Sequence, residues 1–330
     1  MAPMNKPNVL LWTPWTSHQQ AMHDALRDMA DIELVAAANE AEAIAALPRA
    51  DMAMFAGVGF AYGPALAQAV REAPRLRWVQ LLSTGHEALE QHGVPAHLTV
   101  TGVGNSSAGV VAEHAMALLL ALARRIPEAA VQGQRGKWDR SLAANVTSLE
   151  GKTLCLAGYG RIGKETARRA QAFGMRCIAV NRSGRNDTPE LAQQVFPMER
   201  MHEALAQSDA VAISFPLAKD TQGLFGAREW AACKRGAFIV NVGRGAVIDT
   251  DSLVAALQQG QLAGAGLDVT QPEPLPDGHP LWTLPGVLVS PHVGGAGSAA
   301  GLQRLAQLVQ ENIRRFRSDE PLLHTVAIAR

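Results

Sequence analysis

The sequence has no excess of charge of either sign and no long uninterrupted apolar run. Its 330 residues hold 30 lysines and arginines against 30 aspartates and glutamates. Without a basic excess there is no electrostatic signature of binding to nucleic acids or anionic membranes, and we expect neither as a partner. The longest apolar stretch, Val110 to Ala123, is interrupted by Glu113 and His114 and is shorter than the roughly 20 residues that span a bilayer.

Cysteines are few, and no metal-binding pattern is present. The three cysteines, Cys155, Cys177 and Cys233, form no CxxC pair, so buried, reduced thiols are expected. The N-terminus lacks an apolar signal segment with a cleavage site, which favours a cytoplasmic location. The ten histidines follow no HExxH or Cys/His ligand spacing, so we predict no metal site.

Charged residues are also scarce. They make up 18% of the chain, below the roughly 25% of an average soluble domain, whereas apolar residues make up 48%. This composition excludes intrinsic disorder, which requires few apolar groups and much charge. Because 330 residues exceed what one hydrophobic core usually serves, two domains are expected.

Short apolar or β-branched runs alternate with alanine-rich helical segments along the chain, a pattern typical of βαβ units and a parallel sheet. The segment Gly133–Glu150 is polar and is expected to be irregular. The expected strands are Val9–Trp12, Ile32–Ala36, Met52–Phe55, Trp78–Leu81, Leu98–Thr101, Thr153–Ala157, Cys177–Val180, Ala210–Ser214, Ala237–Asn241, Ala263–Val269 and Gly286–Ser290. The main expected helices are Ser17–Met29, Pro64–Glu72, Ser107–Arg125, Asp249–Gln259 and Ala299–Arg317.

A glycine motif follows the expected strand Thr153–Ala157. Residues 158–163 read Gly-Tyr-Gly-Arg-Ile-Gly and fit GxGxxG, and a helical segment follows them. Gly158 permits the tight turn, Gly160 lets the backbone approach a pyrophosphate, and Gly163 lets the helix pack on the strand. An ordinary glycine turn is the alternative. The flanking strand and helix favour a dinucleotide site, with the phosphates at the helix N-terminus.

The next expected strand ends in Asn181-Arg182-Ser183-Gly184-Arg185. An NAD site usually carries an acidic residue here, which binds the ribose 2′-hydroxyl. No carboxylate stands in this segment to repel a 2′-phosphate, and Arg182 and Ser183 can both donate hydrogen bonds to one. We therefore predict that NADP(H) is preferred over NAD(H). The alternative is that Arg182 and Arg185 are solvated loop charges.

Three polar residues follow three successive expected strands in the second half of the chain. They are Arg244 in Asn-Val-Gly-Arg-Gly, Glu273 in Asp-Val-Thr-Gln-Pro-Glu-Pro, and His292 in Ser-Pro-His-Val-Gly-Gly. Ligands of open parallel sheets bind beyond the carboxyl ends of the strands, so these residues are expected near one site.

In the order and spacing of these motifs the chain resembles the D-isomer-specific 2-hydroxyacid dehydrogenase family over nearly its whole length. The resemblance implies an α/β fold of two doubly wound parallel-sheet domains, the coenzyme domain being Rossmann-like. It places the substrate domain at 1–104 and 297–330 and the dinucleotide-binding domain at 105–296. It also implies a homodimer with the helix around Ser107–Arg125 at the interface.

The resemblance further implies which residues form the site. The catalytic residues would be Arg244, Glu273 and His292. Substrate binding would involve Ser83, Thr84 and Gly85, whose loop follows an expected strand, together with Arg244. Together, the glycine motif and the resemblance assign coenzyme binding to Gly158, Tyr159, Gly160, Arg161, Ile162, Gly163, Asn181, Arg182, Ser183, Pro216, Thr221, Val242, Gly243, Arg244, Asp268, His292, Gly294 and Gly295.

The residue types suit the reduction of a 2-keto acid. His292 titrates near neutral pH and can supply the proton. Glu273 would hydrogen-bond the other ring nitrogen and raise the pKa of His292, and Arg244 would bind the substrate carboxylate. Tyr159 and Cys155 replace an aliphatic residue and a glycine usual in the family, from which we expect only local repacking.

The expected activity is reduction of glyoxylate, hydroxypyruvate or a similarly small 2-keto acid by NADPH. Glu273 argues against formate dehydrogenase, in which a glutamine pairs with the histidine. Phosphite or D-hydroxyacid oxidation remains an alternative, as does a non-catalytic dinucleotide-sensing protein. Trp12, Phe60, Trp138 and Trp282 are candidates for the substrate side-chain pocket, although core packing is the default for each.

Overall fold

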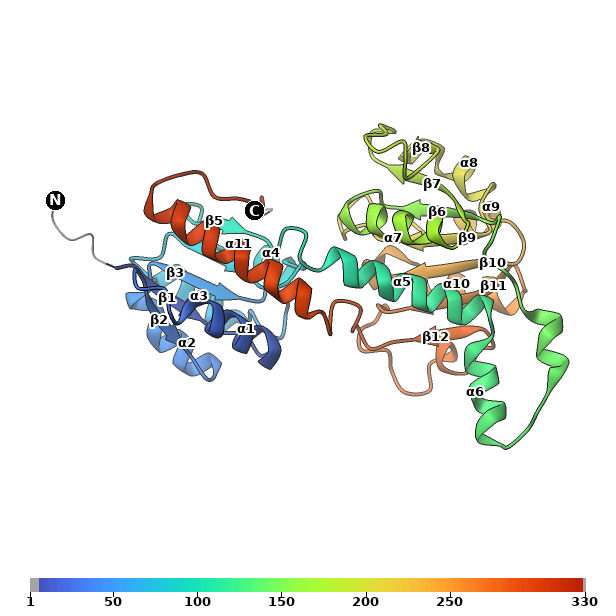
Figure 1. The fold of residues 1–330 in the computed structure, drawn as a ribbon, viewed down its shortest axis with the longest axis horizontal. Coiled ribbons are helices and arrows are strands. Elements are labelled where there is room, and N and C mark those ends of the chain that lie inside the picture. Colours follow the sequence, from blue (N-terminus) through green and yellow to red (C-terminus); the bar gives the residue numbers. More distant parts are fainter. Residues whose placement is uncertain (1–5, 329–330) are drawn as a thin grey trace. The chain divides into compact units, whose positions relative to one another are not determined.

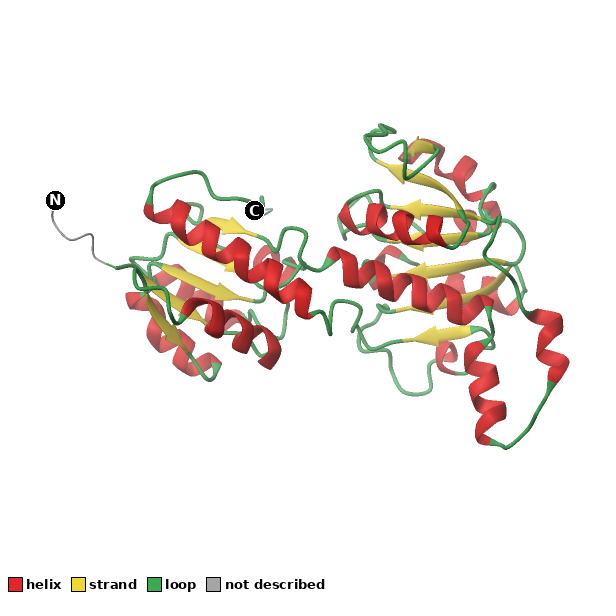
Figure 2. Cartoon of the chain, in the orientation of Figure 1, coloured by secondary structure: helices red, strands yellow, loops and turns green. Residues whose placement is uncertain are grey.

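The computed structural model describes residues 6–328, and the predicted substrate domain extends beyond them at 1–5 and 329–330. Its contacts divide the chain into two compact units. Unit 1 holds the residues up to Ser107 and those from Ser298 onward, and unit 2 holds Ala108–Gly297. Each unit is an α/β structure around one parallel sheet (Figures 1 and 2), as the sequence predicted.

The sheet of unit 1 has five parallel strands in the order β2-β1-β3-β4-β5. This is the order of flavodoxin-like doubly wound folds. The strands are β1 (Asn8–Leu11), β2 (Glu33–Ala36), β3 (Met52–Phe55), β4 (Trp78–Leu81) and β5 (Thr99–Thr101). The helices are α1 (Thr16–Leu26), α2 (Glu40–Ala46), η1 (Leu47–Arg49), α3 (Pro64–Glu72), α4 (Glu87–His92) and α11 (Ala299–Arg317).

The helix near the C-terminus completes the core of unit 1. Leu305, Val309 and Ile313 of α11 pack in one apolar cluster with Leu11 of β1 and Met22 of α1. These three residues recur at helical spacing, so they lie on one face of α11. The last helix therefore belongs with the first strands, although almost three hundred residues separate them in the chain.

The sheet of unit 2 has seven parallel strands in the order β12-β11-β10-β9-β6-β7-β8. Six of them follow the Rossmann order, with the reversal between β6 and β9. The strands are β6 (Thr153–Ala157), β7 (Arg176–Asn181), β8 (Gln194–Pro197), β9 (Ala210–Ile213), β10 (Ala237–Asn241), β11 (Leu262–Leu267) and β12 (Val287–Val289). The helices are α5 (Ala108–Ala123), α6 (Ile126–Gln134), η2 (Arg140–Asn145), α7 (Arg161–Ala172), η3 (Met198–Arg200), α8 (Met201–Leu205), α9 (Ala227–Ala232), η4 (Gly245–Val247), α10 (Thr250–Gln258) and η5 (Pro280–Trp282).

Two segments differ from the sequence-based expectation. Part of the segment Gly133–Glu150 is helical, because η2 forms there with Asp139 accepting a hydrogen bond from the amide of Ser141. The short strand β8 was not expected, since it is an edge strand with a single buried residue, Phe196, and too little apolar pattern to be recognised.

The apolar helix α5 is embedded in unit 2. Ala112, Leu119 and Leu122 are buried, and α5 packs against α7, β10 and β11. The three cysteines are also buried and free, as predicted. Burial raises the pKa of the Cys155 thiol to about 12. No helix within residues 6–328 is long and apolar enough to cross a membrane.

Candidate functional site

The predicted site residues of unit 2 come together at one edge of its sheet. All seven strands are parallel, so the loops after them leave from the same edge. The loops after β6, β7 and β9 hold the glycine motif, Arg182 and Pro216. The loops after β10, β11 and β12 hold Arg244, Asp268 with Glu273, and His292. This edge includes the strand reversal, where such sheets bind ligands.

The glycine motif has the shape that a dinucleotide requires. Gly158 has a φ of 103°, and a Cβ on it would lie 2.8 Å from the carbonyl carbon of Ser214. Gly163 packs on the carbonyl of Gly158, so a side chain there would separate the helix from the strand. By contrast, the space beside Gly160 is open, and Gly160 is the N-cap of α7. An open backbone surface at a helix N-terminus fits a pyrophosphate.

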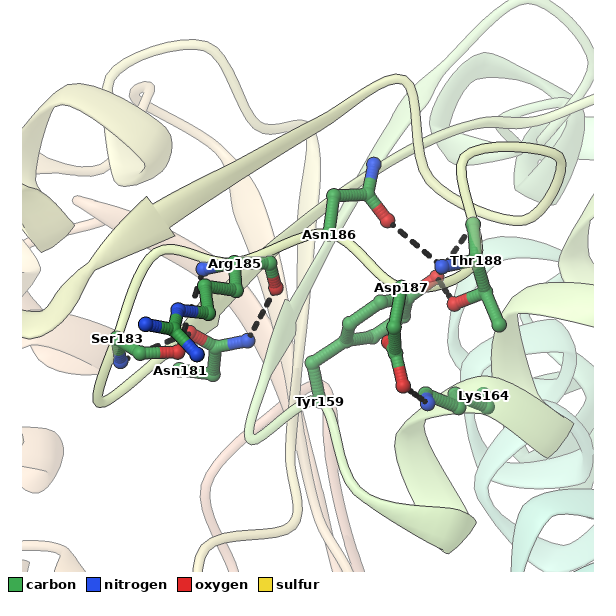
Figure 3. Close-up of polar contacts among 8 residues, drawn as sticks. All are labelled: Tyr159, Lys164, Asn181, Ser183, Arg185, Asn186, Asp187 and Thr188. Atoms are coloured by element: carbon green, nitrogen blue, oxygen red, sulfur yellow. Dashed lines mark hydrogen bonds and ion pairs between the residues drawn. The ribbon is translucent and has the colours of Figure 1, made fainter.

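The loop after β7 is folded around the side chain of Asn181 (Figure 3). Its Oδ1 accepts hydrogen bonds from the amides of Ser183 (3.1 Å) and Gly184 (2.7 Å), and its Nδ2 donates to the carbonyl of Arg185 (2.9 Å). Asn181 was predicted to bind the coenzyme. In the structure its side chain stabilises the turn through these hydrogen bonds. Arg182 and Ser183 are exposed on that turn.

The segment Asn181–Arg185 holds no carboxylate, but one lies beside this turn from another loop. Asp220 reaches it from the loop after β9, and Arg182 donates a hydrogen bond to Asp220 at 3.2 Å. Both side chains are exposed, so water screens the pair and its strength is small. Sequence reasoning missed Asp220 because 38 residues separate it from Arg182.

Three other residues predicted to bind the coenzyme also make contacts within unit 2. The hydroxyl of Thr221 donates to the carbonyl of Pro216 (2.7 Å) and accepts from the amide of Ala218 (2.8 Å), which shapes the loop after β9. Val242 is buried in the apolar core of unit 2. Gly243 is also buried, and a Cβ on it would lie 2.7 Å from the carbonyl oxygen of Phe215.

His292 and Glu273 form a close pair, as predicted. Nδ1 of His292 lies 2.6 Å from Oε1 of Glu273. This hydrogen bond raises the pKa of His292 above its ordinary value, against the lowering effects of partial burial and of the Arg244 charge. His292 has a φ of 53°, a left-handed conformation that few residues other than glycine adopt. Its amide donates to the carbonyl of Asp268 (2.9 Å), which holds this conformation.

The loop that carries Arg244 packs directly on the segment after β11. Gly245 lies against the carbonyl of Thr270 with no room for a side chain, which brings the two loops together. Asn241 shapes the Arg244 loop, since its Nδ2 donates to the carbonyl of Arg244 (3.0 Å) and its Oδ1 accepts from the amide of Gly243 (3.0 Å). The charge of Arg244 lowers the pKa of His292, against the raising effect of Glu273.

Asp268, which was predicted to contact the coenzyme, also shapes the loop that carries His292. Its carboxylate is 4% exposed and accepts hydrogen bonds from the Ser290 hydroxyl (2.7 Å) and the amides of Val293 (2.9 Å) and Gly294 (2.8 Å). His114 of α5 lies 3.2 Å from the same carboxylate. Asp268 therefore positions the backbone on both sides of His292. Gly294 is required beside it, because a Cβ there would lie 2.7 Å from the carboxylate.

The predicted substrate-binding loop lies in unit 1, after β4. The hydroxyl of Ser83 is buried, accepts a hydrogen bond from the amide of Gly57 (2.7 Å) and donates to the carbonyl of Gly85 (2.6 Å). Ser83 therefore ties this loop to the Gly57 loop after β3, and its hydroxyl is used for that purpose. Thr84 is exposed and contacts Ser107 at 2.9 Å.

Sequence reasoning missed His114, Asn241 and Asp220 as contributors to the site. His114 left a signal, because it and Glu113 are the two polar side chains of the apolar helix α5. Its Nε2 lies 2.8 Å from the Ser290 hydroxyl. Within residues 6–328, no cluster of three histidine, cysteine or acidic side chains could hold a metal ion. Of the remaining residues predicted to bind the coenzyme, Arg161 and Gly295 are exposed, Ile162 is half-buried and Tyr159 is buried.

Comparisons with known proteins agree with this geometry. Residues 116–294 match the family model described as D-isomer specific 2-hydroxyacid dehydrogenase, NAD binding domain. A glyoxylate reductase of Thermococcus gammatolerans is 36% identical over 256 residues, which cover 75% of each chain. A D-isomer specific 2-hydroxyacid dehydrogenase family protein of Aeromonas salmonicida has a TM-score of 0.85 at 28% identity, covering 98% of this chain and all of that one. An NADPH-dependent glyoxylate/hydroxypyruvate reductase of Sinorhizobium meliloti, solved with NADP and sulfate, has a TM-score of 0.82 at 25% identity, over 97% and 98% of the two chains.

Proposed function

Because the chain belongs to the D-isomer-specific 2-hydroxyacid dehydrogenase family, we propose that it reduces small 2-keto acids to D-2-hydroxy acids with NADPH. Glyoxylate and hydroxypyruvate are the proposed substrates, as the names of the T. gammatolerans and S. meliloti proteins suggest. The observation that carries the proposal is the 2.6 Å contact between His292 and Glu273 beside Arg244.

His292 would act as the proton donor. Glu273 occupies Nδ1, so Nε2 is the nitrogen left to protonate the carbonyl oxygen of the substrate. Glu273 stabilises the imidazolium and thereby keeps His292 protonated to a higher pH. A proton donor placed in this way contributes roughly 100- to 10,000-fold to a rate.

Arg244 would bind the substrate carboxylate. Its planar guanidinium offers forked donors that match the two carboxylate oxygens. Asn241 and the packing of Gly245 on Thr270 set the shape of its loop. This shape fixes the position of the backbone from which the Arg244 side chain extends. In unit 1, the backbone amides of Ser83, Thr84 and Gly85 are proposed to bind substrate. Unit 1 would thus be the substrate domain and unit 2 the coenzyme domain.

Bound NADPH supplies the hydride. The open backbone at Gly160 and the N-terminus of α7 would hold its pyrophosphate. Arg182 and Ser183, exposed on the turn after β7, would bind its 2′-phosphate by charge-assisted hydrogen bonds. The absence of an acidic residue within that turn supports the preference for NADPH over NADH, although the carboxylate of Asp220 weakens the positive charge there.

A second copy of this chain is the proposed partner. The family resemblance implies that the interface lies at the helix around Ser107–Arg125, which is α5 in the structure. Most apolar residues of α5 pack inside unit 2. The apolar residues exposed nearby lie on and after α6, namely Ile126, Val131 and Trp138, the last of which is 93% exposed. Exposed apolar groups gathered in one segment favour an interface. Light scattering would show a dimer for the wild type and a shift towards monomer for Trp138→Glu.

The test of the proposed reaction is a steady-state assay of NADPH oxidation with glyoxylate, hydroxypyruvate and larger 2-keto acids. We expect turnover with the small acids and a D-configured product from hydroxypyruvate. Turnover of phosphite instead would identify the phosphite alternative. NADPH binding without turnover of any of these compounds would favour the dinucleotide-sensing alternative and contradict the proposal.

A further inference from the structure

The tyrosine of the glycine motif makes contacts that local repacking does not explain. Tyr159 is buried, and its hydroxyl donates to the carbonyl of Thr188 (3.2 Å) and accepts from the hydroxyl of Thr188 (2.8 Å). Burial raises the pKa of Tyr159, so the hydroxyl keeps the proton that it donates. The side chain of Tyr159 in the glycine motif is thus hydrogen-bonded to Thr188, 29 residues later in the sequence.

A second contact links the loop after β7 to α7. Nζ of Lys164 lies 2.5 Å from the carboxylate of Asp187, the residue before Thr188 (Figure 3). The same Nζ lies 5.6 Å from the centre of the Tyr159 ring. Asn186 continues the turn, since its Oδ1 accepts from the amide of Thr188 (3.1 Å). We refer to Tyr159, Lys164, Asp187 and Thr188 as the clasp.

Two residues of the clasp, Asp187 and Thr188, follow closely after the turn that carries the proposed 2′-phosphate ligands. The hydrogen bonds of Asn181 hold the internal shape of that turn and end at the carbonyl of Arg185. They do not fix the direction in which the chain leaves it. Lys164 and Tyr159 hold Asp187 and Thr188, two and three residues after Arg185, so the chain is restrained where it leaves the turn (Figure 3).

We propose that Tyr159 is a positioning residue for coenzyme selectivity: its hydroxyl, through Thr188, holds the turn of Arg182 and Ser183 at a fixed place relative to the glycine motif. The inference rests on the proposed function, because it concerns how the chain recognises the 2′-phosphate of NADPH. One coenzyme molecule must reach both places at once, its pyrophosphate at Gly160 and its 2′-phosphate at the turn. Fixing the span between them lowers the ordering cost of binding.

NADH lacks the 2′-phosphate and does not need Arg182 and Ser183 to be in place. Loss of the hydroxyl should therefore weaken NADPH and leave NADH nearly unchanged. The net contribution of one hydrogen bond corresponds to roughly a threefold to tenfold loss in the NADPH-to-NADH ratio of kcat/KM. The loss should lie mainly in KM for NADPH, because the clasp does not include His292, Glu273 or Arg244.

The experiment compares Tyr159→Phe with the wild type. Phenylalanine keeps the ring that packs in the core and lies near Lys164, and it removes the hydroxyl alone. Thr188→Val should reproduce the effect and Thr188→Ser, which keeps a hydroxyl, should largely restore selectivity. The chain has two tyrosines, and the other supplies a matched control. Tyr62 is a buried tyrosine of unit 1 whose hydroxyl also donates to a backbone carbonyl, that of Gly93 (3.1 Å).

Binding of adenosine 2′,5′-bisphosphate and of 5′-ADP, measured by calorimetry, gives a readout that needs no turnover. We expect Tyr159→Phe to weaken the bisphosphate threefold to tenfold and 5′-ADP by less than twofold, with neither changed in Tyr62→Phe. A wild-type protein that binds both equally would overturn the coenzyme proposal and this inference with it. A wild-type preference for the bisphosphate that Tyr159→Phe leaves intact would overturn the inference alone, even if the variant were less stable to heat.

Discussion

Nδ1 of His292 and Oε1 of Glu273 lie 2.6 Å apart, in the two loops that follow neighbouring strands of one parallel sheet. The pair depends on the backbone around it. Asp268 holds the amides of Val293 and Gly294, and its carbonyl accepts from the amide of His292 in a left-handed conformation. The imidazole is thus held both at its ring and at its backbone, which fixes its orientation.

Replacing Glu273 with Gln tests the effect of this pair on proton donation. Reduction needs the imidazolium, so its rate falls as pH rises through the pKa of His292. Glu273 raises that pKa, and its loss should move the fall in kcat/KM to lower pH and reduce activity at pH 7 and above. The matched control is Glu229→Gln, which breaks the His202–Glu229 pair (2.9 Å) of the same unit. Identical profiles for the wild type and Glu273→Gln would show that the pair does not control the proton donor.

Replacing Arg244 with Lys tests the proposed binding of the substrate carboxylate. An ammonium group keeps the charge but cannot form two parallel hydrogen bonds. We expect KM for glyoxylate to rise about tenfold or more, the scale of one lost charge-assisted hydrogen bond. Arg235→Lys, at an exposed arginine of the same unit, is the control. Steady-state kinetics with both substrates varied decides the outcome, and an unchanged KM for glyoxylate would exclude Arg244 as the carboxylate ligand.

Replacing Asp220 with Asn tests whether this carboxylate competes with the 2′-phosphate for Arg182. The pair is exposed and weak, so its loss should lower KM for NADPH by about twofold to fivefold. KM for NADH should not change. In an Arg182→Ala background the same replacement should have much less effect, since the shared partner is gone. A rise in KM for NADPH would show instead that Asp220 helps to hold Arg182 in place.

Replacing Asp268 with Asn tests the positioning of the His292 loop. The buried carboxylate accepts from two backbone amides and one hydroxyl, and an amide NH₂ group cannot accept any of these bonds. We expect unit 2 to lose about 1–3 kcal/mol in its free energy of unfolding, with kcat lowered more than KM for NADPH is raised. Asp277→Asn is the control, because Asp277 is exposed in the same region. Equal denaturation midpoints for the two variants would contradict the positioning role.

Much of the fold was predictable because its signals are local. The runs Met52–Phe55, Trp78–Leu81 and Ala237–Asn241 are buried strands whose predicted bounds agree with the structure. The edge strand β8 and the helix η2 were not predictable, because their apolar pattern is weak.

The residues of the candidate site also differ in whether a local sequence signal made them predictable. The glycine motif and the His292–Glu273 pair were predicted, because spacing along the chain and parallel strands place them. The roles of Asp220, His114 and Thr188 were not predicted, because each acts through a partner at least 29 residues away in the sequence. Such contacts depend on how loops fold against one another, which no local pattern records.

The central claim is that His292 donates the proton in an NADPH-linked reduction of a small 2-keto acid. The most direct measurement is the rate of NADPH oxidation with glyoxylate by the wild type and by His292→Asn, because asparagine tolerates the left-handed backbone at this position. We predict wild-type turnover and a loss of roughly 100- to 10,000-fold in kcat for the variant. Equal rates for the two proteins would contradict the account.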